Sequence, residues 1–312
     1  MELGLCCKFY QEPIKFRIYT LSNIRLIHED SLDSAREKVL GIVYQNIRSL
    51  QDALDYCRDH SIGSFRVSSD MIPHLTSMRK LNILTENDLE QIQSQLSEIR
   101  THNIILSMHP GQHVNMGSPH PDVVDNSLTD LDEHFFVAEP LGCTEINIHV
   151  GGAYGNKPNA VNRFMENMGK RIPEDKLSYM TIENDELNYS VEEVVEIASE
   201  LGIRATYDIH HKRCYEMRYP GTQSERDYLE LCRATWDGFE YQRVHLSSPK
   251  FGYRDFAKSR SHHNFININD FPKWLLDYPD VHLDIEAKAK ELAIADLQQK
   301  LKRVRNETEL RV

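Results

Sequence analysis

The sequence has no long apolar run and no pair of cysteines spaced like a small zinc site. Its 312 residues include six cysteines, and none of them forms a C-x-x-C pair. No stretch approaches the length of a membrane-spanning helix, and the first residues lack the apolar core of a secretory signal. We therefore expect neither a zinc-knuckle protein nor a membrane protein, but a cytoplasmic protein whose cysteines are small buried side chains.

The chain also lacks the excess of basic residues with which many proteins attract DNA. Asp and Glu number 48 against 36 Lys and Arg, which gives a net charge of -12. Any contact with DNA must therefore depend on a local basic patch, or on metal ions that neutralise clustered carboxylates. Histidine, with 15 copies, is abundant by contrast, and these imidazoles are candidate metal ligands.

Short β-rich segments alternate with amphipathic segments along the chain. Strands are expected at residues 3–7, 64–69, 104–109, 145–150, 179–184, 204–210, 243–248 and 281–286. Between them, apolar residues recur at three- and four-residue steps, as in residues 39–54, 121–141 and 158–171. A further helix is expected to start at a capping box formed by Ser190 and Glu193 and to end at Gly202.

Eight strand–helix units in a chain of this length predict an α/β fold, a single-domain (β/α)8 TIM barrel. The domain is expected to cover residues 1–312, with a basic C-terminal helix at about 291–312. A doubly wound open sheet is the alternative. It would need a glycine-rich phosphate loop after the first strand, where Gly4 stands alone.

Histidines and carboxylates recur at the carboxyl ends of the expected strands, where TIM barrels build their active sites. Seven strands carry such a residue there, with Asp70 after the second strand, and His262 in the loop after the seventh strand adds another. The set comprises His109, His149, Glu183, Asp208, His211, His245, His262 and Glu286. We expect these side chains to converge at the mouth of the barrel.

Such a set is a candidate metal centre, because clustered carboxylates do not stay ionised together without a counter-charge. Imidazole and carboxylate ligands suit zinc, manganese or iron. At about four to six ligands for each ion, with some carboxylates bridging, the set predicts about two or three divalent ions. Glu183 is the expected bridge because its strand is central in the series. A centre of this kind activates water and steadies both oxygens in phosphodiester hydrolysis.

The motifs at these strand ends resemble those of the UV-damage endonuclease family, with endonuclease IV as a more distant relative. They are M-H-P-G-Q at 108–112, H-V-G-G-A-Y-G at 149–155, E-N-D-E at 183–186, D-x-x-H at 208–211, H-L-S-S at 245–248 and E-A-K-A-K-E at 286–291. The resemblance implies a TIM barrel with divalent metal ions, often Mn²⁺, with Zn²⁺, Co²⁺ or Mg²⁺ as alternatives. It implies ATP-independent incision of double-stranded DNA on the 5′ side of cyclobutane pyrimidine dimers and 6-4 photoproducts, leaving a 3′-hydroxyl and a 5′-phosphate.

The resemblance also assigns roles to individual residues. It implies that the eight residues of the set above are metal ligands, that Asp70 is a further metal position, and that Glu183, Asp208, His245 and Glu286 are catalytic. Gln112 and His113 follow the H-P-G motif, where the family inserts Gln and an aromatic residue into the DNA. A histidine offers less surface than a tyrosine for this wedge.

Two further departures from the family pattern affect the site. Arg243 stands where the family has a lysine that carries a carbamate near the metals, and a guanidinium cannot form that carbamate. Either a water takes its place, or Arg243 is a catalytic residue that binds phosphate directly. Leu5 replaces a tyrosine that helps to hold the lesion, which bears on the range of lesions.

Basic residues after the seventh strand are candidates for contact with DNA phosphates. They are Lys250, Arg254, Lys258 and Arg260, on the side of the expected active site. Tyr154 and Lys157, after the H-V-G-G motif, are further candidates for contact with the DNA backbone.

Three alternative functions remain open at this point. An abasic-site endonuclease would use the same metal chemistry. A lesion-binding protein with weak catalysis would fit the departures at Leu5, His113 and Arg243, although a mere binder has no need of so many costly carboxylates and imidazoles. A sugar isomerase of the xylose-isomerase kind would share the barrel and its metals, but the H-P-G-Q motif and the many histidines argue against it.

Overall fold

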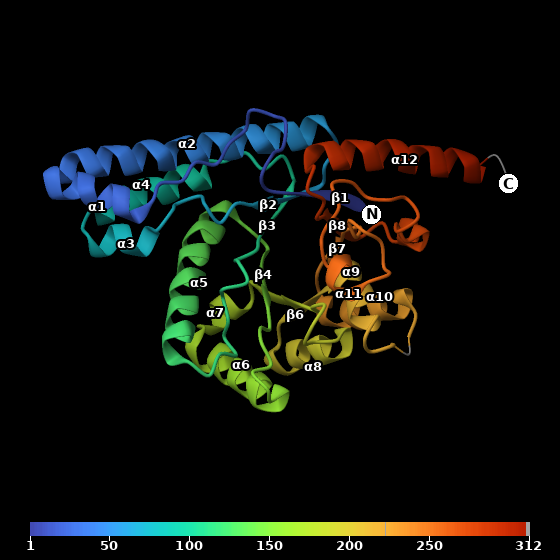
Figure 1. Ribbon diagram of the computed structural model, residues 1–312. Helices are drawn as coiled ribbons and strands as arrows, with labels where there is room; N and C mark the ends of the chain where they lie inside the picture. Colours follow the sequence, from blue (N-terminus) through green and yellow to red (C-terminus); the bar gives the residue numbers. More distant parts are fainter. Residues whose placement is uncertain (222, 310–312) are drawn as a thin grey trace. The chain divides into compact units, whose positions relative to one another are not determined.

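A computed structural model describes residues 1–221 and 223–309 of the chain, and Figure 1 labels its helices and strands. Within these residues, eight strands follow one another around a closed barrel in the order of the sequence. The pairs β1–β8, β3–β4, β5–β6, β6–β7 and β7–β8 run parallel. The prediction of a (β/α)8 TIM barrel is confirmed.

The strands begin and end within two residues of their predicted bounds. They are β1 (Glu2–Cys6), β2 (Ser64–Val67), β3 (Ile105–Met108), β4 (Glu145–His149), β5 (Met180–Glu183), β6 (Arg204–Asp208), β7 (Gln242–Leu246) and β8 (Val281–Ile285). The sixth strand was expected to run to residue 210, and it ends at Asp208. There the Asp208 side chain accepts a hydrogen bond from the backbone N–H of His211 and starts a helix, so that His211 lies in a first helical turn.

The helices of the described residues also follow the predicted pattern. They are α1 (Leu21–Asp30), α2 (Leu32–Asp59), α3 (Leu75–Lys80), α4 (Glu86–Ser97), α5 (Pro121–Leu141), α6 (Lys157–Arg171), α7 (Glu174–Leu177), α8 (Val191–Leu201), α9 (Ile209–Glu216), α10 (Glu225–Arg233), α11 (Phe256–Ser259) and α12 (Glu291–Glu309), with 3₁₀-helices η1 (Ala234–Trp236) and η2 (Lys273–Asp277). Helix α12 begins where the C-terminal helix was predicted, and residues 310–312 of that prediction lie outside the described residues. In this part of the chain no helix has both the length and the apolar character needed to cross a membrane.

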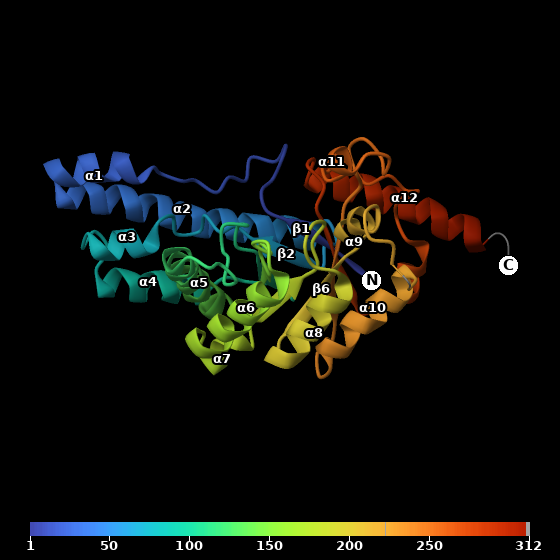
Figure 2. The ribbon, with the colours of Figure 1, turned by 60° about the horizontal axis from the view of Figure 1, so that its bottom comes forward.

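The chain divides into two compact units, which are considered separately. The first unit comprises Met1–Pro13, Ile62–Phe65 and Thr181–Val312, and the second comprises Ile14–Ser61 and Arg66–Met180. In the first unit α8 and α10 lie side by side, and in the second α1 lies along α2 (Figures 1 and 2). The single domain predicted for residues 1–312 stays a prediction.

Helix α8 shows why the local sequence sets its bounds. The Ser190 hydroxyl accepts a hydrogen bond from the backbone N–H of Glu193, and the Glu193 carboxylate accepts one from the backbone N–H of Ser190. Gly202 ends the helix at φ 65°, a left-handed conformation that glycine adopts at little cost. The predicted capping box and helix end are both confirmed.

Four strands of the first unit carry a row of residues that lie in register. Asp208 pairs with His245, His245 with Asp284, and Asp284 with Gly4. Residues paired in register in a parallel sheet point to the same face, so these positions share one layer. Asp208, His245 and Asp284 are each 1% exposed. A side chain at Gly4 would overlap Asp284 Oδ1 and Ser64 Oγ, so glycine makes room for the buried carboxylate.

We expect Gly4→Ala to lower the free energy of unfolding by about 1–3 kcal/mol, because the added methyl group must displace Asp284 from its place. Gly41→Ala is the matched control. Gly41 lies on the exposed face of α2 with no atom within 4 Å of its Cβ position, so alanine should stabilise the helix by about 1 kcal/mol or less. Denaturant unfolding followed by circular dichroism measures both, and equal effects would contradict the close approach at Gly4.

Candidate metal centre

The ends of four strands in the first unit bring titratable side chains together. Glu183 is the last residue of β5 and Asp208 the last of β6, while β7 carries His245 and β8 is followed directly by Glu286. Glu183 and Asp208 are each 1% exposed. Strand ends therefore place three carboxylates and an imidazole in a small buried volume, as the sequence predicted for these four residues.

His245 lies at the centre of this group. Its Nδ1 atom is 2.7 Å from Glu183 Oε2, 3.6 Å from Glu286 Oε1 and 3.9 Å from Asp208 Oδ2. One ring nitrogen thus faces three carboxylate groups. Asp208, His245 and Glu286 each offer a ligand atom within 4.8 Å of the others, which is close enough to hold one metal ion.

His211 forms a second group with two of the same carboxylates. Glu183, Asp208 and His211 also offer ligand atoms within 4.8 Å of one another. The Nδ1 atom of His211 is 3.0 Å from the carbonyl oxygen of Asn184, so a proton on Nδ1 leaves Nε2 available as a ligand. Asp208 belongs to both groups, which makes Asp208 a bridging candidate within this unit, while the bridging role expected of Glu183 stays a prediction.

Asn184 holds Asp208 in place and was not among the predicted site residues. Its Nδ2 donates to the Asp208 carbonyl at 2.9 Å, and its Oδ1 accepts from the Asp208 backbone N–H at 2.9 Å. These two bonds fix the end of β6 against the residue that follows β5. Asn184 is the asparagine of the E-N-D-E motif, so the motif marked it as a candidate. Its hydrogen-bond partner, Asp208 on another strand, could not be predicted from the sequence.

The electrostatics of the group favour a bound cation. Burial raises the pKa of Asp208, and the nearby Glu286 and Glu183 raise it further against the opposing effect of His211. Burial alone would lower the pKa of His211, but Asp208, Glu183 and the other carboxylates around it raise that pKa to about 10. When no metal ion is present, the carboxylates repel one another and a protonated imidazole offsets part of their charge. Imidazole and carboxylate groups are also the ligands that manganese, zinc and iron prefer. The donor set therefore fits divalent metal ions.

The loop after β7 contributes His262 to the same region. Its Nδ1 is 2.9 Å from the Glu286 carbonyl oxygen and 3.9 Å from Glu286 Oε2, and its ring centre is 6.4 Å from that of His211. The adjacent His263 instead bonds to Phe265 in its own loop. His262 is therefore the histidine of this loop that lies with the other candidate ligands.

His210 lies beside these ligands without their charge. Its Nδ1 is 2.9 Å from the Tyr253 hydroxyl. Burial, together with His262 and His211, lowers the pKa of His210 to about 3, so this imidazole is neutral at physiological pH. It separates the charged group from Tyr253 and packs edge-on against His262, with ring centres 5.1 Å apart.

In the second unit, the ends of β3 and β4 place His109 and His149 beside each other. Their ring centres are 5.4 Å apart, and His109 Nδ1 is 3.0 Å from the carbonyl oxygen of Pro110. Both imidazoles are half-buried and could contribute to one metal site. Asp70 follows β2, and its carbonyl oxygen accepts a hydrogen bond from Asn46. A metal role for Asp70 stays a prediction.

Arg243 is buried rather than presented to DNA. It is 1% exposed, and its Nη1 donates to Asp284 Oδ1 at 2.9 Å. A contact between this guanidinium and a DNA phosphate would need an exposed side chain, so the structure disfavours the phosphate-binding alternative. Leu5, at the position of the family tyrosine, is completely buried as well. Asp284, the partner of Arg243, was not among the predicted site residues.

The candidate DNA contacts lie on exposed segments of both units. In the loop after β7, Lys250, Arg254, Lys258 and Arg260 are all exposed. Arg260 is tied to Glu186 at 2.7 Å. In the second unit, Gln112 and His113 are exposed next to His109, and His113 Nε2 is 2.9 Å from Asp130 Oδ2. The wedge position is thus accessible, and a carboxylate orients its imidazole.

The remaining two candidates, Tyr154 and Lys157, lie at the start of α6 in the second unit. Tyr154 is 47% exposed, and its hydroxyl accepts a hydrogen bond from Asn115 Nδ2 at 2.8 Å. Lys157 is the first residue of α6 and is half-buried. A role for either residue in DNA binding stays a prediction.

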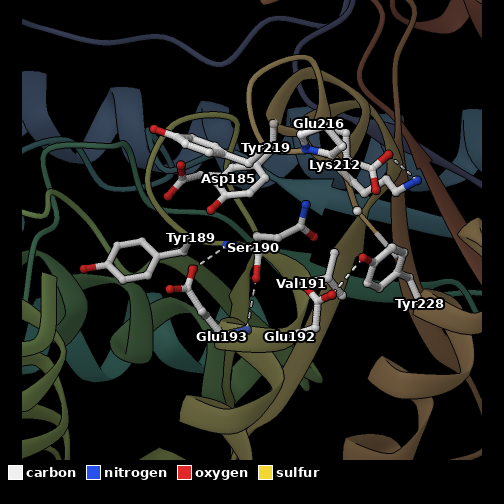
Figure 3. A pocket seen from close by; sticks show the side chains of 14 residues that line it. Asp185, Tyr189, Ser190, Val191, Glu192, Glu193, Lys212, Glu216, Tyr219 and Tyr228 are labelled. Atoms are coloured by element: carbon white, nitrogen blue, oxygen red, sulfur yellow. Dashed lines mark hydrogen bonds and ion pairs between the residues drawn. The ribbon is translucent and has the colours of Figure 1, made fainter. Parts of the chain in front are cut away.

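A pocket of about 330 Å³ lies beside the start of α8 in the first unit (Figure 3). Its lining includes the charged side chains of Asp185, Glu192, Glu193, Glu216 and Lys212 and the rings of Tyr189, Tyr215, Tyr219 and Tyr228. Lys212 is paired with Glu216 at 2.6 Å, and the Tyr228 hydroxyl donates to Glu192 at 2.7 Å. The excess of carboxylates repels phosphate groups, so this pocket is not the surface that binds a nucleic acid backbone.

Comparison with known proteins gives matches over nearly the whole chain. The family model described as UV-endonuclease UvdE matches residues 1–311. A Nostoc sp. protein named UV DNA damage endonuclease is 29% identical over 302 residues, which cover 95% of this chain and 89% of that protein. The crystal structure of SacUVDE matches with a TM-score of 0.81 at 28% identity and covers 98% of this chain and 99% of that one. Endonuclease IV from Thermus thermophilus, at 14% identity and a TM-score of 0.55, covers 82% of this chain and 94% of that one and shares the fold.

We expect metal binding to release a proton from His211 at pH 8. The pKa of about 10 means that the imidazole is protonated at this pH, and the proton must leave before the nitrogen can bind a cation. Affinity for Mn²⁺ should therefore rise as the pH rises toward 10. Isothermal titration in buffers of different ionisation enthalpy measures the release, which should be about one proton or more.

The control is His263→Gln, which changes an exposed imidazole of the adjacent loop and should leave the proton release unchanged. An observed heat of binding that does not depend on the buffer would show that His211 is already neutral in the protein without metal.

Proposed function

The chain belongs to the UV-endonuclease UvdE family, and on this premise we propose that it is a metal-dependent endonuclease for UV-damaged double-stranded DNA. The proposed reaction is hydrolysis of the phosphodiester on the 5′ side of cyclobutane pyrimidine dimers and 6-4 photoproducts, with a 3′-hydroxyl and a 5′-phosphate as products. No role for ATP is proposed, and the cytoplasmic location stays a prediction.

The observation that carries this proposal is the buried group of Glu183, Asp208, His211, His245 and Glu286. Its two ligand groups share Asp208, as in a centre that holds more than one ion. We propose that His109, His149 and His262 complete it, giving about two or three ions with Mn²⁺ as the favoured metal. When bound, the metal ions supply Lewis acidity to the scissile phosphate and lower the pKa of water.

The residues of the chain have distinct parts in this proposal. Asp208 and His245 orient the centre because both are buried and lie in register on adjacent strands. Glu183 takes part in the binding of cations and in holding His245, at 2.7 Å. The imidazolium of His211 loses its proton when a cation binds, which keeps the net charge of the group close to balance.

Binding to damaged DNA requires contacts outside the metal centre. Gln112 and His113 are proposed to fill the gap left by the lesion, because both are exposed and lie shortly after the candidate ligand His109 in the same loop. A dimer is poorly stacked, so turning it out of the helix costs less than turning out normal bases, by up to a few kcal/mol. Tyr154, Lys157 and the basic residues of the loop after β7 are proposed to contact the backbone.

Three alternatives differ from this proposal in substrate or in activity. An abasic-site endonuclease would use the same ligands, and the shared fold of endonuclease IV keeps it a candidate. A lesion-binding protein with weak catalysis would bind the dimer without cutting it. A sugar isomerase is the least favoured, because it needs a small closed pocket at the metals rather than exposed Gln112 and His113.

The proposal predicts a single cut just 5′ of a dimer in a labelled duplex with Mn²⁺. EDTA should abolish the cut, and Glu183→Gln should slow it by more than about 100-fold, because loss of a ligand carboxylate disrupts the cation site. Glu166→Gln is the matched control, since Glu166 is an exposed residue of α6 that pairs with Lys170, and it should cut at the wild-type rate. Gel electrophoresis resolves the products.

The outcomes of this assay separate the alternatives. Tight binding of the dimer without a cut would reject the endonuclease and leave the lesion-binding protein. Cutting of an abasic duplex but not of the dimer would move the proposal to abasic sites. Neither binding nor cutting of either duplex would reject a DNA substrate.

The loop after β7 should account for part of the salt dependence of DNA binding. We expect Arg254→Gln with Lys258→Gln to reduce the slope of log K against log salt concentration by about two, because each phosphate contact contributes about 0.9. Lys170→Gln with Arg171→Gln removes the same charge from the end of α6 and should leave the slope unchanged. Fluorescence anisotropy at several salt concentrations measures both, and equal slopes in the two double variants would place the phosphate contacts elsewhere.

A further inference from the structure

We propose that Asp284 and Arg243 are positioning residues that hold the His245 ring in the orientation needed to bind a metal ion. This inference rests on the proposed metal centre, and it adds two residues that do not themselves touch the ion. It is carried by the row of in-register residues that crosses β6, β7, β8 and β1.

The two ring nitrogens of His245 face different groups. Nδ1 faces the carboxylates of Glu183, Glu286 and Asp208, at 2.7 to 3.9 Å. Nε2 lies on the other side of the ring, 3.8 Å from Asp284 Oδ2. A histidine that binds a metal through one nitrogen keeps its proton on the other, usually directed at a carboxylate or a carbonyl. At 3.8 Å this approach is longer than a hydrogen bond, so Asp284 acts on the ring as the charged group on its Nε2 side, opposite the three carboxylates that face Nδ1.

Arg243 holds Asp284 in a buried ion pair. Both side chains are 1% exposed, and Arg243 Nη1 donates to Asp284 Oδ1 at 2.9 Å. Burial of a charged side chain is costly unless the charge is paired and hydrogen-bonded, so the guanidinium fixes the place of this carboxylate. Because the guanidinium occupies Oδ1, the second oxygen, Oδ2, remains on the side of His245.

The residues around Asp284 and Arg243 leave room for the carboxylate and contact both side chains. Gly4, in register with Asp284, leaves room for the carboxylate, and Ser64 Oγ lies 3.4 Å from Oδ1 on the same side as Arg243. The guanidinium lies 5.6 Å from the centre of the Tyr241 ring, which is within reach of a cation–π contact. Arg243 therefore acts through Asp284 and His245 rather than by contact with substrate.

The alternative is that the pair only stabilises the barrel. A buried ion pair contributes little net stability compared with apolar residues of similar volume, while removal of one partner is strongly destabilising. The double variant Arg243→Met with Asp284→Leu should therefore fold, since it removes both charges together. It also removes the carboxylate beside Nε2, so it separates metal positioning from stability.

The test measures Mn²⁺ affinity by isothermal titration and the free energy of unfolding of the metal-free protein. For the double variant we expect an affinity about 10- to 100-fold below that of wild type, the range for loss of a residue that orients a ligand, with stability close to wild type. Asp284→Asn should show the same loss of affinity. Asp88→Asn is the matched control, because it breaks the Arg36 ion pair in the second unit and should change stability but not affinity.

The results distinguish failure of this inference from failure of the proposed function. If wild type binds Mn²⁺ and both the double variant and Asp284→Asn bind it equally well, the positioning role is wrong. A similar loss of affinity in Asp284→Asn and in Asp88→Asn would also overturn it, because the affinity would then follow stability alone. If wild type itself binds no Mn²⁺, Zn²⁺ or Co²⁺, the proposed metal centre fails. If the double variant does not fold, Asp284→Asn alone decides: an affinity equal to that of wild type overturns the inference.

Discussion

Repulsion among buried carboxylates is the constraint on which the site depends. Glu183 and Asp208 are almost completely buried at adjacent strand ends, and Glu286 lies close to them. Burial makes each negative charge costly, and each neighbour adds to that cost. Cations offset this negative charge. When metal is absent the cation is the protonated His211, and in the proposed function it is the divalent ions, which displace the proton of His211. Stability and metal binding are therefore linked, because the same carboxylates oppose folding alone and favour it with a cation present.

Most of the fold could be predicted because each element carries a local signal. Apolar segments marked the strands, and the Ser190 capping box and Gly202 set the bounds of α8. The error at β6 arose where two signals compete. The segment from 204 to 210 is rich in strand-forming residues, but Asp208 caps the helix that follows, and a bond to the backbone N–H of His211 ends the strand. The D-x-x-H spacing fits both a pair of ligands and a helix cap, and here one carboxylate serves both.

The site could be predicted as a set of residues but not as a geometry. Glu183, Asp208, His245 and Glu286 lie together because strand ends in a barrel converge, which follows from the alternation of strands and helices alone. The partners of each residue depend on register between strands that are distant in sequence. Asn184 and Asp284 were missed for this reason, and the burial of Arg243 against Asp284 could not be foreseen when phosphate binding was one of two alternatives for it. A residue type shows what chemistry is possible, whereas the register decides which neighbour it meets.

The acidic character of the chain limits how it can select damaged DNA. A net charge of -12 opposes long-range attraction to the DNA backbone, so undamaged DNA gains little from the protein surface as a whole. The proposed sources of favourable charge are the exposed basic residues of the loop after β7 and any bound metal ions, and both act only at close range because salt screens charge over about 8–10 Å. Affinity then depends on bringing a phosphodiester down to the mouth of the barrel, and this deformation costs less where base stacking is already weakened. A protein that attracts DNA weakly in general but binds it strongly at one site would thus favour lesions because damaged DNA deforms more easily. It would not need to recognise the chemistry of each photoproduct.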